Sequence, residues 1–115
     1  MMNAELEMTE NELKQFEKDM ERFSVIQKEN NFKTIWCIDE IENLNETSFI
    51  SADYITDGVN DIKVELPNKE LTWLELWKYA DDLNNLIGYS DHIFIESFEV
   101  KQVNGKDQLE VFFGS

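Results

Sequence analysis

The sequence predicts an α+β fold in a single domain that spans residues 1–115, with the element order α-β-β-β-α-β-β. Three observations support this prediction. Two amphipathic stretches begin with helix-capping signals, several short stretches are rich in β-branched and aromatic residues, and the end of the chain has the pattern of a β-hairpin. We expect two helices packed on a mostly antiparallel five-stranded sheet.

The first predicted element is an amphipathic helix from about Thr9 to Glu29, with a capping box formed by Thr9 and Glu12. Apolar residues form a narrow seam along it: Leu6, Leu13, Phe16, Met20 and Phe23. This spacing also suits a coiled coil, although acidic residues on both sides of the seam oppose self-pairing. We therefore expect the helix to pack on the chain's own sheet, and we expect residues 1–8 to be frayed or disordered.

Three short strands are predicted next, over residues 32–39, 48–55 and 61–66. Turn-like segments separate them, which favours an antiparallel meander. Asp57-Gly58 is typical of a hairpin turn. A calcium loop that begins at Asp53 lacks ligands at its third and twelfth positions, so the pattern argues against an EF-hand-like site.

The stretch LTWLELWKYADDLNNLIG, over residues 71–88, predicts the second helix. Thr72 and Glu75 form a capping box at its start, and Gly88 ends it. The order of the first five elements is similar to that of double-stranded-RNA-binding domains. However, the chain lacks the lysine cluster and the basic helix start that would hold phosphates.

The face that each residue of this second helix presents follows from a helical wheel. Trp73 lies within the apolar stripe and is predicted to be a core residue, whereas Trp77 lies at its edge and is predicted to be partly exposed. Glu75, Asp81 and Asp82 fall on the opposite arc, which we expect to face solvent.

The end of the chain predicts a hairpin around Asn104-Gly105, and a two-residue loop fixes its register. The predicted pairs are Val103 with Lys106, Val100 with Leu109, Phe98 with Val111 and Glu96 with Phe113. Glu96 should therefore be partly buried on the apolar face, with a raised pKa.

The same register places Glu99 opposite Glu110 on the solvent face, and like charges opposed across two strands destabilise a hairpin. Nearby Lys101 or Lys106 could relieve the repulsion, or a bulge could shift the register. Alternatively, the site accepts a cation from a partner.

The charge of the chain is its most unusual property. There are 25 acidic and 10 basic residues, which gives a net charge of −15. The acid is spread along the whole sequence, so the folded protein should repel nucleic acid and anionic membranes and attract cationic proteins.

Catalytic and metal chemistry have few candidate residues. Cys37 is the only cysteine and His92 the only histidine, the four glycines are scattered singly, and Cys37 is predicted to lie in a buried strand. We therefore expect no enzyme activity, no metal and no cofactor. No signal peptide or long apolar stretch is visible, so the sequence favours a cytoplasmic protein.

These observations favour a non-enzymatic acidic inhibitor that binds a cationic protein, without binding nucleic acid or membranes itself. In size and charge alone, the chain is similar to nucleic-acid mimics of phage and mobile elements, which occupy basic grooves on nucleic-acid-processing proteins. Three alternatives stay open: an immunity or antitoxin protein that neutralises a cationic toxin, a structural or assembly subunit that binds through the first helix, and a small enzyme or ligand-binding domain. A monomer is favoured.

Nine carboxylates are the candidate partner-binding residues. They are Glu75, Asp81, Asp82, Glu99, Glu110, Asp39, Glu40, Glu42 and Glu46.

Overall fold

A computed structural model describes residues 10–115, apart from some side chains in the first helix: Glu12, Gln15, Phe16, Asp19 and Met20. Residues 10–31 belong to one compact unit, and Phe32–Ser115 form another. The first unit contains helix α1 (Glu10–Glu29), which confirms the predicted helix. Its predicted capping box, most of its apolar seam and the expected fraying of residues 1–8 lie outside the described residues.

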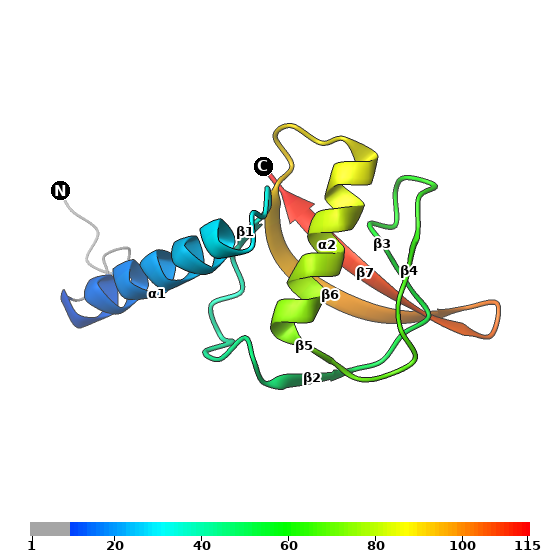
Figure 1. The fold of residues 1–115 in the computed structure, drawn as a ribbon, viewed down its shortest axis with the longest axis horizontal. Helices are drawn as coiled ribbons and strands as arrows, with labels where there is room; N and C mark the ends of the chain where they lie inside the picture. Colours follow the sequence, from blue (N-terminus) through cyan, green and yellow to red (C-terminus); the bar gives the residue numbers. More distant parts are fainter. Residues whose placement is uncertain (1–9) are drawn as a thin grey trace, which may run out of the picture. The chain divides into compact units, whose positions relative to one another are not determined.

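The second unit contains one helix and seven strands, so the α+β class is confirmed (Figure 1). The elements are β1 (Ile35–Trp36), β2 (Thr47–Ile50), β3 (Tyr54–Thr56), β4 (Val64–Glu65), β5 (Leu71–Thr72), α2 (Trp73–Ile87), β6 (Phe94–Val103) and β7 (Lys106–Gly114). No helix within residues 10–115 is apolar over a stretch long enough to cross a lipid bilayer.

The sheet topology differs from the predicted meander. Five strands form a mixed sheet in the order β1-β6-β7-β3-β4, and β2 pairs with β5 in a separate two-stranded sheet. Strands β1 and β3 run parallel to β6 and β7, respectively, whereas β6–β7 and β3–β4 are antiparallel. Strand β1 pairs with one edge of the long β6–β7 hairpin, and β3 pairs with the other edge. These long-range pairings replace the predicted local pairing of β1 with β2. Five strands, rather than the predicted three, lie between the two helices, so the predicted element order is wrong, and with it the likeness to double-stranded-RNA-binding domains.

All three predicted strands are shorter than expected, the third being reduced to β4, and side chains and bulges interrupt the first two. The backbone N–H of Thr34 donates to the Asp81 carboxylate at 2.7 Å rather than to a neighbouring strand. The predicted strand over residues 48–55 is divided between β2 and β3, which belong to different sheets. Phe49, within β2, has a left-handed backbone conformation with φ 59°.

Helix α2 begins and ends where the sequence predicts. The Thr72 hydroxyl accepts the Glu75 N–H at 3.1 Å, and the Glu75 carboxylate accepts the Thr72 N–H at 3.0 Å. Gly88 closes the helix in the left-handed conformation, with φ 87°. Both caps are local interactions, which explains why sequence alone locates them.

The two tryptophans of α2 exchange the roles predicted for them. Trp77 is fully buried, whereas Trp73, the first residue of the helix, is only half-buried. The indole N–H of Trp77 donates to the Thr34 hydroxyl at 3.0 Å, and its ring lies 5.5 Å from that of Trp36. The wheel failed because the buried face also includes polar residues, Asp81 and Asn84, that bond to neighbouring segments.

The β6–β7 hairpin confirms the predicted turn and most of the predicted register. Asn104 and Gly105 both have positive φ, and Val103 pairs with Lys106. A bulge between Ile95 and Ser97 makes the Glu96–Phe113 pair wrong, since Phe113 pairs with Ile95 instead. Ile95 is consequently fully buried and Glu96 is exposed, so the prediction of a partly buried Glu96 is also wrong.

Candidate functional site

Six of the nine predicted carboxylates are exposed. Four of them lie between β1 and β2, one lies on α2 and one on β6: Asp39, Glu40, Glu42, Glu46, Asp82 and Glu99. From residue 34 to residue 62 the chain has seven acidic residues and no lysine or arginine. All the charged residues of this segment are therefore negative, and a surface of negative charge attracts cations.

Two of the predicted carboxylates serve the fold instead. The prediction that Asp81 faces solvent is wrong: it is buried, and one of its oxygens accepts both the N–H and the hydroxyl of Thr34 at 2.7 Å. Glu75 is half-buried, and its carboxylate holds the start of α2. The Thr72 backbone N–H and the Lys69 ammonium, which lies 3.2 Å away, lower the pKa of Glu75.

Glu99 and Glu110 face each other across the hairpin as predicted. The Lys101 ammonium lies 3.1 Å from the Glu110 carboxylate, whose side chain is only 13% exposed. This ion pair relieves the repulsion within the chain itself, which was one of the predicted explanations.

A pocket of about 490 Å³ brings Glu110 together with residues from other segments. We call it the acidic pocket. Its lining comes from the loop after β3, the loop after α2 and the β6–β7 hairpin: Asp57, Gly58, Val59, Tyr89, His92, Glu96, Glu110, Val111, Phe112 and Phe113. Three of these residues are acidic, and none of the described lining residues is lysine or arginine. Carboxylates and aromatic rings therefore share one cavity.

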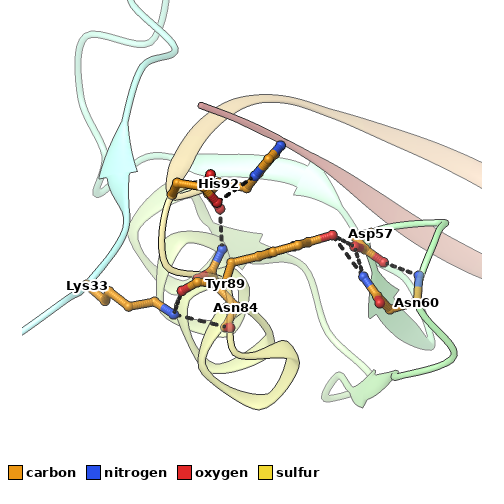
Figure 2. Close-up of polar contacts among 7 residues, drawn as sticks. Lys33, Asp57, Asn60, Asn84, Tyr89 and His92 are labelled. Carbon is orange, nitrogen blue, oxygen red and sulfur yellow. Dashed lines mark hydrogen bonds and ion pairs between the residues drawn. The ribbon is translucent and has the colours of Figure 1, made fainter.

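Asp57 fixes one wall of the acidic pocket (Figure 2). One of its oxygens accepts the N–H groups of Val59 and Asn60, and the other accepts the Asn60 amide and the Tyr89 hydroxyl at 2.7 and 2.8 Å. Burial by itself would raise the pKa of Asp57, but these hydrogen bonds lower it below the ordinary value. Asp57 thus stays ionised at neutral pH, and its oxygens are already occupied.

Tyr89 and His92 are held by the end of α2. The buried Asn84 amide donates to the His92 carbonyl at 2.8 Å, and the Lys33 ammonium donates to the Tyr89 carbonyl at 2.9 Å (Figure 2). The Tyr89 ring lies 5.3 Å from the His92 ring and 6.1 Å from the Phe113 ring. The hydrogen bond to Asp57 raises the pKa of Tyr89. The aromatic wall is therefore positioned before any ligand arrives.

The other two carboxylates of the pocket lie against glycines. A Cβ added to Gly58 would meet the Glu110 carboxylate at 2.9 Å, and one added to Gly114 would meet the Glu96 carboxylate at 2.5 Å. Both glycines thus leave room for a carboxylate. No hydrogen bond to the Glu96 carboxylate is found among the described residues, so this carboxylate remains open to a ligand.

This arrangement suits a cation better than an anion. A guanidinium or ammonium group attracts carboxylates and also lies favourably over aromatic rings. Within residues 10–115, no three side chains of histidine, cysteine, aspartate or glutamate are grouped as metal ligands. The carboxylates and the aromatic rings of the acidic pocket are both groups that attract an organic cation.

The prediction that Cys37 is buried is wrong, since this cysteine is exposed. Partial desolvation of the thiol raises its pKa, and the negative charge of Glu96 raises it further. A raised pKa keeps the thiol protonated at neutral pH, which is unfavourable for a nucleophile.

Sequence reasoning missed most of the acidic pocket. It identified Glu110, interpreted Asp57 as turn chemistry and assigned no role to Tyr89. The pocket joins three segments that are distant in sequence, through pairings such as that of β3 with β7. The single useful local signal was Glu96, a carboxylate within an apolar strand pattern.

Comparisons of this chain with protein-family models, with curated proteins and with solved structures found no match.

Proposed function

We propose that this protein is a non-enzymatic, acidic inhibitor that binds a cationic protein partner, and that the acidic pocket receives a basic side chain of that partner. The observation that carries the proposal is the convergence of Asp57, Glu96 and Glu110 with the Tyr89 ring in one cavity. A pocket with fixed walls loses little conformational entropy on binding, which favours affinity.

The charge outside the pocket supports the same proposal. The segment from residue 34 to residue 62 has acidic residues but no lysine or arginine, and the net charge of the chain is −15. Both attract a basic surface over long range. Such steering raises association rates by roughly 10- to 1000-fold at low salt. In this proposal the partner is a nucleic-acid-processing protein of the cytoplasm, whose basic groove is occupied by the exposed carboxylates. The same field repels nucleic acid and anionic membranes.

The fixed pocket also favours a second candidate, an immunity or antitoxin protein that neutralises a cationic toxin. A nucleic-acid mimic needs carboxylates spaced along a surface, whereas the acidic pocket selects one side chain of one partner. Selection of one side chain suits a protein with a dedicated partner.

The proposal is tested by purifying the partner and comparing matched variants. A pull-down at low salt from cells that carry this protein identifies the partner: a nucleic-acid-processing enzyme supports the first candidate and a toxin the second. Glu96→Gln should then weaken binding of the purified partner by roughly tenfold, about 1.4 kcal/mol. Glu65→Gln, the control, changes an exposed carboxylate that lies outside the pocket and is not one of the nine candidate partner-binding residues, and it should have less than about a twofold effect.

Two results would contradict the proposal. One is partner binding that does not weaken as the salt concentration rises, since a charge-steered contact is screened. The other is an equal effect of Glu96→Gln and Glu65→Gln, which would show that the pocket has no special part in binding.

A further inference from the structure

Phe49 combines two features that are each unfavourable within the chain. Its side chain is 84% exposed, although phenylalanine is a large apolar residue. Its backbone has φ 59°, in the left-handed region that bulky residues rarely adopt. Neither burial nor backbone preference therefore explains a phenylalanine at this position.

A bulge in the β2–β5 sheet creates this conformation. Thr47 pairs with Thr72 and Ile50 pairs with Leu71, so Ser48 and Phe49 form an insertion in β2. Bulges often place a glycine in the left-handed conformation, but here the position is occupied by Phe49. We call Ser48 and Phe49 the Phe49 bulge.

Ser48 holds the bulge in place on both sides of Phe49. Its side chain is buried, its hydroxyl donates to the Leu71 carbonyl at 2.6 Å, and it accepts the Ile50 N–H at 3.1 Å. Strained residues persist where the surrounding structure fixes them, and they cluster at ligand-binding positions. The exposed ring is thus presented by a fixed backbone.

The surroundings of the Phe49 bulge define the chemistry of what covers it. Phe49 lies in the segment from residue 34 to residue 62, which has no lysine or arginine. Glu46 precedes β2, Glu70 precedes β5, and both are exposed. A second copy of the chain or an anionic membrane would bring like charges together at this place, whereas a basic protein would be attracted.

We propose that Phe49 is an aromatic anchor that inserts into an apolar pocket on a basic protein, with lysine or arginine residues around the rim of that pocket. This inference rests on the proposed function, because it assigns a second contact with the same cationic partner. Phe49 and the acidic pocket lie near opposite ends of α2. The backbone N–H groups at the start of α2 bond to Leu44 and Glu46, whereas the loop after the end of the helix lines the acidic pocket.

The chemistry can be tested with a small host that imitates the partner. β-Cyclodextrin has an apolar cavity, and its per-amino derivative adds ammonium groups at the rim. NMR titration at low salt should shift the Phe49 ring signals, with roughly tenfold higher affinity for the amino derivative than for neutral β-cyclodextrin. Phe49→Asn should abolish this preference, because asparagine tolerates the left-handed backbone but removes the ring.

Leu86→Ala is the matched control. Leu86 is 63% exposed on α2 and lies one helical turn from the carboxylate of Asp82, so it also combines apolar surface with acid. This variant should bind the amino host as the unmodified protein does. Equal affinity for both hosts, equal shifts at Leu86 and Phe49, or unchanged binding by Phe49→Asn would overturn the inference.

Stability and partner binding separate an anchor from a structural residue. The melting temperature of Phe49→Asn should equal or exceed that of the unmodified protein, and a decrease would show that the ring supports the fold. With the purified partner, Phe49→Asn should raise the dissociation constant by roughly 30-fold, as loss of an aromatic hot spot does.

Two further outcomes assign Phe49 to another occupant and would also overturn the inference. They are Phe49-dependent dimers in light scattering and Phe49-dependent binding to phosphatidylcholine vesicles. If Glu96→Gln weakens partner binding and Phe49→Asn does not, only this inference fails. If neither variant weakens it, the proposed function fails as well.

Discussion

Two carboxylates of the acidic pocket have different physical roles. Asp57 is only 9% exposed and accepts four hydrogen bonds from Val59, Asn60 and Tyr89. Glu96 is exposed and keeps its carboxylate available. Asp57 therefore builds the wall and contributes charge, whereas Glu96 can contact a ligand directly. Substitutions at the two positions should consequently affect different properties.

Asp57→Asn should destabilise the protein by about 1–3 kcal/mol at neutral pH, since it removes acceptors for partly buried donors. The folded-state pKa of Asp57 is lowered from the ordinary 3.8. The ionised carboxylate thus contributes stability above that ordinary pKa, and this contribution is lost as the pH falls through the folded-state pKa. The gap between the two proteins should therefore shrink below about pH 4.

Urea unfolding across this pH range measures the effect. Asp61→Asn is the control, because Asp61 is an exposed carboxylate in the same loop. A stability gap between Asp57→Asn and the unmodified protein that stays constant into acid would contradict the role assigned to Asp57.

Among the elements, the helix and the hairpin were predictable because their determinants are local. The Thr72–Glu75 capping box and the Asn104-Gly105 turn each operate within a few residues. The short strands were not predictable, since β1 and β3 take their places only by joining the edges of the hairpin. The acidic pocket was not predictable for the same reason, because its loops meet only through those strand pairings.

The hydrogen bonds between α2 and the segment before β1 were also not predictable from the sequence. Asp81 is polar, and a helical wheel assigns polar residues to solvent. Its burial is explained by Thr34, a buried threonine 47 positions earlier that donates two hydrogen bonds to it. A buried carboxylate with such partners fixes one segment against another.

Asp81→Ala should lower the free energy of unfolding by about 2–4 kcal/mol, because it leaves the Thr34 N–H and hydroxyl without their acceptor. Asp82→Ala, at the next and exposed position, should change it by less than about 0.5 kcal/mol. Thermal unfolding of both variants checks this. Equal stability of the two would mean that Asp81 belongs to the surface, as the wheel predicted.

In the whole molecule, charge is combined with shape. Net charge alone attracts any basic surface, and it was visible in the sequence. The acidic pocket and the Phe49 bulge add shape near opposite ends of α2, because the bulge lies in β2 beside the start of the helix and the loop after its end lines the pocket. Together they describe a protein that is guided to a cationic partner by its field and recognises it by two defined contacts.

The most direct test of this account is an NMR titration of the protein with two short blocked peptides, one containing arginine and the other its neutral analogue citrulline. The arginine peptide should shift the signals of Tyr89 and Phe113. It should bind about fivefold more tightly than the citrulline peptide, equivalent to about 1 kcal/mol, and Glu96→Gln should remove this preference. Equal binding of the two peptides, or shifts spread over all the exposed carboxylates without a preference for the acidic pocket, would contradict it.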